Sequence, residues 1–167
     1  MISETVIRAV LEADYAKVVE LNDSEVRHTS AMDLERVSYL NKLSAYHRLA
    51  ELDGTAAAFL LAMKDHAPYQ NDNFKWFAAR YDQFLYIDRI VVGADFQGQG
   101  IGSLLYRDLF EYARDQKIAL ITCEINIIPP NQRSFAFHAA HGFKEVGRQW
   151  VDNGQKQVSM QVANNHI

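Results

Sequence analysis

The spacing of apolar and polar residues changes repeatedly along the chain between a two-residue period and a helical period. Alternation over a short run predicts a strand, whereas apolar residues that recur every three or four positions predict a helix. The pattern predicts a strand, two helices, three strands, a helix, a strand, a helix and two strands. The segments that give this order are residues 5–10, 12–23, 33–46, 47–64, 84–92, 100–116, 118–126, 127–142, 143–151 and 156–162.

Local signals refine several of these elements. Asp53-Gly54 is a preferred two-residue turn between strands, so residues 47–64 are expected to form a hairpin. The second helix should begin at Asp33 or Ser30, because both are N-cap residue types. The residues expected on one face of the first helix are Ala13, Ala16 and Val19, and Tyr15 is a further candidate for this face.

A polar segment rich in aromatic residues occupies residues 65–83. A loop of this length is usually functional or disordered, and its aromatic content argues against disorder. The strand–helix–strand unit of residues 84–126 must join two parallel strands. We therefore expect a mixed α/β single domain over residues 1–163, with a tail at residues 164–167, about seven strands in one central sheet and about four helices.

Composition and charge narrow the function classes. The 167 residues, 49% apolar and 23% charged, suit one globular domain with its own core. The net charge of −4 and the lack of a Lys/Arg run disfavour nucleic acid as the main partner. The single cysteine excludes an internal disulfide framework. No apolar run approaches the roughly 20 residues of a membrane span, and the N-terminus lacks the apolar core of a signal peptide, so we expect a soluble, cytoplasmic protein without a membrane partner.

Three glycines at alternate positions, Gly98, Gly100 and Gly102, lie between the strand of residues 84–92 and the following helix. A helix N-terminus offers unpaired N–H groups and partial positive charge, and glycines let a phosphate approach the backbone. This arrangement predicts an anion site. A nucleotide-hydrolysing P-loop would need a lysine after the last glycine, and a dinucleotide-binding loop would need a different glycine spacing.

Two motifs resemble those of the GCN5-related N-acetyltransferase (GNAT) superfamily. The loop Gln97-Gly98-Gln99-Gly100-Ile101-Gly102 resembles its Q/R-x-x-G-x-G/A signature. The block "NQRSFAFHAAHGF", residues 131–143, resembles its later N-x-x-A/S-x-x-(apolar)-Y-x-x-x-G-F block and follows one helix and one strand later. The resemblance implies an acyl-CoA N-acyltransferase-like α/β fold and an enzyme that uses acetyl-CoA as acyl donor, without a metal.

The resemblance also implies the cofactor contacts. The pantetheine arm would lie between the splayed ends of strands 84–92 and 118–126 and pair with backbone groups. The glycine loop would hold the pyrophosphate, and polar side chains would add contacts to both parts. The residues implied are Ile90, Val91, Val92, Gln97, Gly98, Gln99, Gly100, Ile101, Gly102, Ser103, Asn131 and Ser134.

Acetyl transfer needs a base, because a protonated amine cannot attack a thioester, and it is helped by an acid for the leaving thiolate. By resemblance, Asp88 and Glu124 are the candidate bases. Glu124 could instead supply charge for the substrate or solvate its strand, and Asp88 could form a paired surface dipeptide with Arg89. The family's acid is a tyrosine at the position of His138. A histidine could donate to the thiolate or bond to a backbone carbonyl instead, and Tyr86 or a water could replace it.

The acceptor site is expected to involve the first two helices and the aromatic segment at residues 65–83. Aromatic faces could hold an amine or another cation, and an enclosed aromatic site suits a small molecule better than a peptide. The residues expected to contact the acceptor are Tyr69, Asn73, Trp76 and Asn22.

The leading hypothesis is an acetyl-CoA-dependent N-acyltransferase that acts on a small-molecule or peptide amine by direct transfer in a ternary complex. A non-catalytic CoA-binding sensor would bind the same cofactor without turnover. A nucleotide or dinucleotide binder would respond to ATP or NAD. Members of the superfamily often dimerise, and the last two strands could pair between two chains to form a homodimer.

Overall fold

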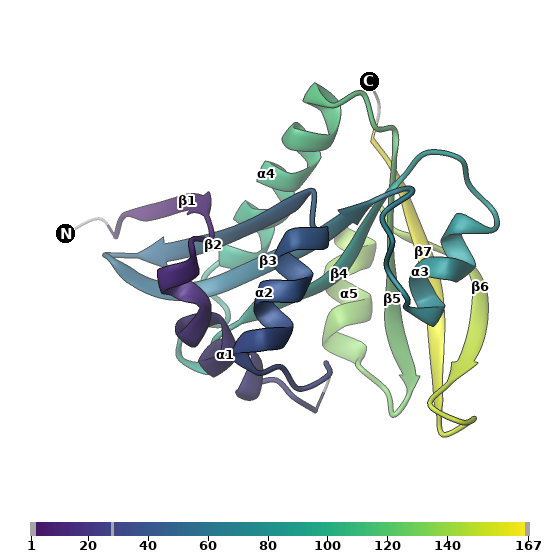
Figure 1. Cartoon of the computed structure of the whole chain (residues 1–167), viewed down its shortest axis with the longest axis horizontal. Coiled ribbons are helices and arrows are strands. Elements are labelled where there is room, and N and C mark those ends of the chain that lie inside the picture. The colour runs from purple at the N-terminus through teal and green to yellow at the C-terminus, as the bar shows by residue number, and fades with distance from the viewer. Residues whose placement is uncertain (1–2, 28, 166–167) are drawn as a thin grey trace. The chain divides into compact units, whose positions relative to one another are not determined.

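In a computed structural model, which describes residues 3–27 and 29–165, the chain has the α/β fold that the sequence predicts (Figure 1). The described residues form a seven-stranded mixed sheet in the order β1-β2-β3-β4-β5-β7-β6, together with five α-helices. The chain divides into two compact units, Met1–Met63 with Asp88–Glu111, and Lys64–Ile87 with Tyr112–Ile167. Strand β4 and helix α4 each contribute residues to both units; their bounds are Leu85–Val92 and Ile101–Asp115.

The first unit contains an antiparallel ladder in which β2 lies between β1 and β3. Asp53 and Gly54, with φ angles of 50° and 80°, form the turn between β2 and β3, and Leu52 pairs with Thr55 across it. The predicted hairpin is thus confirmed. The bounds are β1 Thr5–Ala9, α1 Tyr15–Asp23, α2 Leu34–Leu43, β2 Tyr46–Leu52 and β3 Thr55–Lys64.

Alternation along β2 shows which helices flank this ladder. The Tyr46 hydroxyl and Arg48 Nη1 both donate to Asp108 Oδ2 of α4, each at 2.7 Å. His47, between them, points to the other face, where its Nδ1 lies 2.8 Å from Asn41 Oδ1 of α2. Helices α2 and α4 therefore lie on opposite faces of β2 (Figure 1). The Asp108 contacts fasten the helix that follows the glycine loop to the ladder.

Helix α1 buries a different face from the predicted one. Ala13 and Ala16 are exposed, whereas the buried residues of α1 are Val18, Leu21 and Asn22. Their three- and four-residue spacing places them on a single face. Val18 and Leu21 remove more apolar surface from water than two alanines would, so the larger side chains decide which face packs inward.

The start of α2 is at one of the two predicted positions. Asp33 is its N-cap, and the Asp33 carboxylate accepts the Arg36 N–H at 2.7 Å. Val37 and Leu40, one turn apart, are the buried residues of this helix.

The second unit contains the antiparallel strands β5, β7 and β6. Strand β5 begins parallel to β4, with Leu85 opposite Ile121 and Tyr86 opposite Thr122, which confirms the predicted parallel strand–helix–strand unit. The bounds are α3 Asp72–Ala78, β5 Leu120–Ile128, α5 Gln132–Ala140, β6 Lys144–Val151 and β7 Lys156–Asn164.

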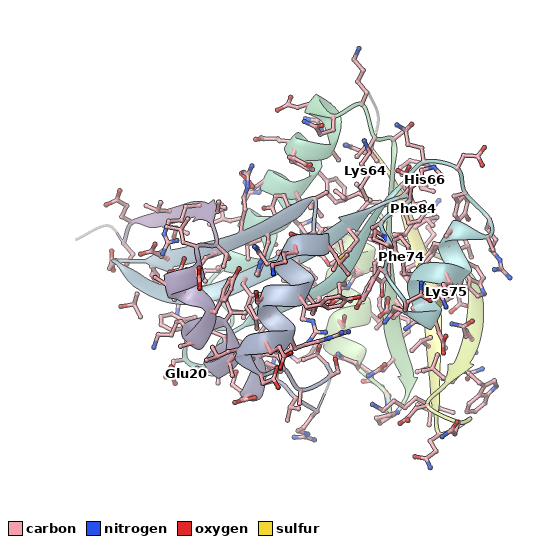
Figure 2. The ribbon with its side chains drawn as sticks, in the orientation of Figure 1. Glu20, Lys64, His66, Phe74, Lys75 and Phe84 are labelled. Carbon is pink, nitrogen blue, oxygen red and sulfur yellow. The ribbon has the colours of Figure 1, made fainter. Side chains whose placement is uncertain are left out.

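Helix α3 lies in the segment that was expected to be a loop, and it adds a helix to the predicted set. Asn71 caps it by accepting the Phe74 N–H at 3.0 Å. Phe74 and Phe77, three residues apart, are buried on one face. The Phe74 ring packs against Phe84, with 5.6 Å between ring centroids (Figure 2). A good cap and an apolar pair therefore suffice for a short helix that packing stabilises.

Asn164 and Asn165, the first two residues of the predicted tail, are among the described residues. Strand β7 continues to Asn164. Asn165 is buried, its N–H donates to the Ala119 carbonyl at 2.7 Å, and its side chain accepts from Arg114 at 3.4 Å. Residues 166–167 of the predicted tail lie outside the described residues.

Candidate active site

The glycine loop has the geometry of an anion site. After β4 the chain passes through a short 3-10 turn, and Gly98 and Gly100 have φ angles of 77° and 80° just before α4 begins at Ile101. Among the described residues, a Cβ added at either glycine would have no heavy atom within 4 Å. The glycines are thus required for their backbone conformation, and the space beside them is open to a ligand.

Helix α4 presents its N-terminal end at this loop. Its hydrogen-bonding pattern includes the Leu104 N–H donating to the Gly100 carbonyl at 3.1 Å. The first turn of α4 contains no acidic side chain that would repel an anion. The helix dipole and the N–H groups of the first turn therefore favour a bound phosphate.

Gly93, directly after β4, holds the strand close to its neighbours in the first unit. Its N–H donates to the Ala57 carbonyl at 2.8 Å. A Cβ at Gly93 would lie 2.9 Å from Leu21 Cδ2 and 3.3 Å from the Ala57 oxygen. A Cβ here would require the Leu21 side chain to move and would press on the backbone of β3, so this glycine allows the strand that leads into the loop to lie close to both.

Gln97, the first residue of the signature, uses its side chain within the protein. Its Nε2 donates to Glu25 Oε1 at 2.8 Å and to the Val92 carbonyl at 3.2 Å. The side chain therefore joins the glycine loop to the last residue of β4 and to the turn after α1.

Asp88 and Arg89 do form a pair, but it is not at the surface. Arg89 Nε lies 2.7 Å from Asp88 Oδ2, and the two side chains are 6% and 3% exposed, respectively. Arg89 Nη1 also donates to Asn22 Oδ1 at 3.2 Å and to the Ser30 carbonyl at 2.9 Å. A buried guanidinium needs such a set of acceptors, so Asp88 and Asn22 both have a structural role here.

Asn22 also donates from its Nδ2 to the Ser30 carbonyl at 2.8 Å, and its side chain is fully buried. These contacts fix the connection after α1. The predicted contact between Asn22 and an acceptor stays a prediction.

In the second unit, Tyr86 and Glu124 form the contact most suggestive of catalysis. The Tyr86 hydroxyl lies 2.7 Å from Glu124 Oε2 and 3.0 Å from Oε1. Tyr86 is fully buried, and its ring packs against Phe74 and Phe77 of α3, with centroids 5.6 and 6.0 Å apart. The unexpected helix thus fixes the tyrosine, and the tyrosine orients a half-buried carboxylate.

Helix α5 and its N-cap residue include three of the predicted site residues, Asn131, Ser134 and His138. Asn131 caps the helix by accepting the Ser134 N–H at 3.3 Å. His138 Nδ1 lies 2.7 Å from the Ser134 carbonyl oxygen, and because a carbonyl can only accept, Nδ1 carries the proton. Burial lowers the pKa of His138 to about 4, despite the opposing effect of this hydrogen bond. At neutral pH the ring is neutral and Nε2 has no proton to donate.

Two of the residues predicted to contact the acceptor, Tyr69 and Asn73, make contacts with other residues of the second unit. Tyr69 is buried and packs against Phe74, with 5.7 Å between ring centroids. The Asn73 side-chain oxygen accepts from Gln149 Nε2 at 2.9 Å. These contacts join α3 and the segment before it to the rest of the unit, and a role in acceptor binding stays a prediction for both residues.

Trp76, the third of these residues, packs against strand β6. A Cβ on Gly147 would lie 2.6 Å from the Trp76 ring, so only glycine allows this approach. The Arg80 guanidinium lies 3.6 Å from the centroid of the Trp76 ring. The ring is half-buried, and its contact with an acceptor also stays a prediction.

The lone cysteine has no catalytic character. Cys123 is buried in β5, and burial raises the pKa of its thiol well above the usual value. A thiol that stays protonated is a poor nucleophile, so an acyl-cysteine route is disfavoured.

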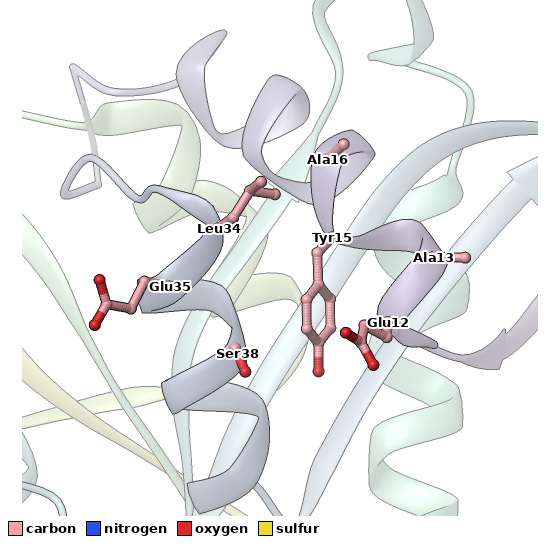
Figure 3. A pocket seen from close by; sticks show the side chains of 7 residues that line it. All are labelled: Glu12, Ala13, Tyr15, Ala16, Leu34, Glu35 and Ser38. Carbon is pink, nitrogen blue, oxygen red and sulfur yellow. The ribbon is translucent and has the colours of Figure 1, made fainter.

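A surface pocket of about 420 Å³ lies between the start of α1 and helix α2 in the first unit (Figure 3). Figure 3 shows Tyr15 between Glu12 and Ser38. Glu35 adds a second carboxylate to the lining. An aromatic face with two carboxylates suits a cation that carries an apolar part. The complete lining is Glu12, Ala13, Tyr15, Ala16, Leu34, Glu35 and Ser38.

Within residues 3–27 and 29–165, no group of three or more His, Cys, Asp or Glu side chains could hold a metal ion. In the same described part of the chain, no helix is both long and apolar enough to cross a bilayer.

Sequence reasoning missed Arg89, Gly93 and Glu25 as residues that shape the site. Arg89 had a signal, because an adjacent acid and base inside the apolar run "FLYIDRIVV" indicate a buried pair. Gly93 had one too, since a glycine directly after a buried strand often marks a close backbone approach. Glu25 had none, because its partner Gln97 is 72 residues away.

Comparison with protein-family models gives a match over residues 12–143 to the model described as the acetyltransferase (GNAT) family. Among the curated proteins compared, none matches the sequence.

Solved structures share the fold at low sequence identity. The ribosomal-protein-S18-alanine N-acetyltransferase of Escherichia coli is 14% identical with a TM-score of 0.75, covering 98% of this chain and 96% of that one. An acetyltransferase of the GNAT family from Streptococcus pneumoniae is 23% identical with a TM-score of 0.72, covering 96% and 99%. The yncA protein of Salmonella typhimurium, solved with its cofactor acetyl-CoA, is 18% identical with a TM-score of 0.74, covering 98% and 95%.

Proposed function

Because the chain belongs to the acetyltransferase (GNAT) family and is an N-acetyltransferase that uses acetyl-CoA, we propose that it acetylates an amine of a small molecule or peptide by direct transfer in a ternary complex. The observation that carries the proposal is the turn at Gly98 and Gly100, whose positive φ angles and open flank precede the N-terminus of α4. This geometry supports the cofactor contacts that the motif implies.

In the proposed donor site, the glycine loop and the first turn of α4, including Ser103, bind the pyrophosphate. Backbone groups of residues 90–92 pair with the pantetheine arm. The Val92 carbonyl accepts from Gln97. The group of Val92 that we propose for the thioester oxygen is therefore its N–H. Asn131 and Ser134, at the start of α5, are proposed as further cofactor contacts because the motif implies them.

The proposed reaction forms the amide C–N bond and breaks the thioester C–S bond, while a proton leaves the nitrogen and a proton is added to the sulfur. The neutral amine nitrogen bonds to the thioester carbonyl carbon, and the carbonyl electron pair moves onto oxygen. The Val92 N–H stabilises this oxyanion. Its collapse breaks the C–S bond and releases the CoA thiolate. The proton that the amine loses passes to the base, and a proton returns to the thiolate, so the products are the amide and CoA.

Glu124 is the proposed base. Asp88 is engaged with a buried guanidinium at 2.7 Å, which ties its carboxylate to a structural contact. Glu124 is half-buried, and the Tyr86 hydroxyl orients its carboxylate. A fixed carboxylate can take the amine proton directly or through one water. Tyr86 is then a positioning residue, since its own proton is directed at Glu124.

A water is the proposed source of the proton for the thiolate. The pKa of about 4 for His138, lowered chiefly by burial, leaves the ring neutral at pH 7. Its one N–H is donated to the Ser134 carbonyl. This arrangement favours a role for His138 in holding the first turns of α5 over the role of the family's tyrosine.

For the acceptor, the pocket between α1 and α2 supports a compound with a second cationic group. Glu12 and Glu35 supply negative charge, and Tyr15 supplies an aromatic face. Basic peptides and polyamine-like small molecules both have this chemistry.

The experiment is a CoA-release assay over a panel of amines and basic peptides, with mass spectrometry of the products. We expect CoA release that depends on the amine, and a loss of roughly 100-fold or more for Glu124→Gln with acetyl-CoA binding retained. Glu20→Gln is the matched control, because Glu20 lies on the exposed side of α1. An unchanged Glu124→Gln rate would exclude Glu124 as the base, and cofactor binding without turnover on the whole panel would favour the sensor alternative.

A further inference from the structure

The side-chain amide of Gln97 is fully used as a donor. Its Nε2 has two N–H groups, and the two acceptors are Glu25 Oε1 at 2.8 Å and the Val92 carbonyl at 3.2 Å. Because neither acceptor can donate, the amide orientation follows from the contacts themselves. This amide nitrogen is therefore not the group that binds a phosphate. The side chain joins the glycine loop, the end of β4 and the turn after α1, and we call these contacts the Gln97 clamp.

Glu25 is itself held in place. It lies in the turn after α1, and its N–H donates to the Asn22 carbonyl at 3.0 Å. The preceding residue, Ser24, donates its hydroxyl to the Leu21 carbonyl at 2.6 Å. Asn22 in turn accepts from Arg89 of β4 at 3.2 Å. The end of α1 is thus fastened to β4 through Arg89 and to the glycine loop through Gln97.

We propose that Glu25 is a positioning residue for the acyl-CoA site. By accepting from Gln97, it holds the loop of residues 97–100 against the end of β4. The loop then has its anion-binding shape before the cofactor arrives, and less conformational freedom is lost on binding. This inference rests on the proposed function, because it concerns the same donor site.

Two substitutions at Glu25 separate the hydrogen bond from the charge. Glu25→Ala removes the acceptor, whereas Glu25→Gln keeps an amide oxygen that can accept from Gln97. Both remove the negative charge. Any general effect of charge on a polyanionic cofactor is therefore the same in both variants. The difference between their affinities for CoA measures the contribution of the hydrogen bond between Glu25 and Gln97.

The test measures binding of free CoA and of acetyl-CoA by calorimetry, the KM for acetyl-CoA, kcat and the thermal midpoint. We expect Glu25→Ala to weaken CoA binding about three- to tenfold relative to Glu25→Gln, as loss of one hydrogen bond would. The KM for acetyl-CoA should rise by a similar factor with kcat within about twofold. Glu20→Ala, which removes an exposed carboxylate on α1, should match the wild type.

Equal CoA binding by Glu25→Ala and Glu25→Gln would overturn the inference, even if both lower the thermal midpoint, since that result describes a merely structural contact. Failure of the wild-type protein to bind CoA would overturn the proposed function as well as the clamp. If only the inference about Glu25 is wrong, the wild type binds CoA and the two Glu25 variants bind it equally, so the two failures are distinguishable.

Discussion

Replacing Asp88 with asparagine should separate a structural carboxylate from the proposed catalytic one. Asp88 and Arg89 are 2.7 Å apart, with side-chain exposures of only 3% and 6%. Asparagine preserves the size of the side chain and one acceptor oxygen, but it removes the charge opposite the guanidinium. Arg89 would stay buried without that countercharge, and this is the source of the expected cost.

Removing one partner of a buried ion pair costs about 3–5 kcal/mol. A chain of this size loses roughly 2–4 °C of Tm per kcal/mol, so Asp88→Asn should lower the Tm by roughly 6–20 °C. Below its new Tm the variant should keep a kcat close to that of the wild type. Thermal and urea unfolding measure the first quantity, and the CoA-release assay at low temperature measures the second.

The matched control for this prediction is Glu20→Gln. Glu20 pairs with Lys17 at 3.1 Å while 71% exposed, and an exposed pair contributes at most about 1 kcal/mol (Figure 2). A wild-type Tm for Asp88→Asn would refute the argument from burial. A folded Asp88→Asn protein without transfer activity would instead assign the base to Asp88.

Three further predictions concern Gly100 in the glycine loop, Tyr86 beside Glu124, and the buried histidines His47 and His138. Gly100→Ala places a side chain at a φ of 80°, so it should cost about 1–2 kcal/mol of stability and weaken CoA binding in calorimetry; unchanged binding would contradict the loop assignment. Tyr86→Phe should lower kcat with little change in KM, because Glu124 loses the donor that orients it; an equal rise in KM would argue for a substrate contact instead. Burial lowers the pKa of His47 and of His138 from 6.5 to about 4, so the unfolded chain takes up protons first as the pH falls. The free energy of unfolding should therefore be greatest above pH 6.5 and decline until about pH 4, by about 3 kcal/mol for each histidine. A urea midpoint that stays constant between pH 7 and pH 4.5 would contradict this.

The order of strands and helices was largely predictable because each long element has a clear period and a local boundary signal. Asp53-Gly54 and the Asp33 cap are examples in which two or three adjacent residues determine the backbone. Helix α3 was not predictable in the same way. Its seven residues are too few to show a period among the surrounding polar positions, and its packing against Phe84 and Tyr86 stabilises it.

The candidate site also has parts that were predictable from local sequence and parts that were not. The glycine loop was predictable, because positive φ angles at Gly98 and Gly100 are a local requirement that glycine meets. The contact of Tyr86 with Glu124 and that of Arg89 with Asn22 join residues 38 and 67 positions apart, and only the folded chain brings them together. The burial of the Asp88–Arg89 pair likewise depends on packing, so the two candidate bases looked equivalent in sequence.

The most direct test of the account is a calorimetric titration of the protein with acetyl-CoA, with ATP and NAD titrated in parallel. If the turn at Gly98 and Gly100 and the N-terminus of α4 hold the acyl donor, acetyl-CoA will bind with micromolar affinity and neither nucleotide will give heat. No heat with acetyl-CoA, or equal binding of ATP, would contradict the assignment of this loop to the pyrophosphate of CoA.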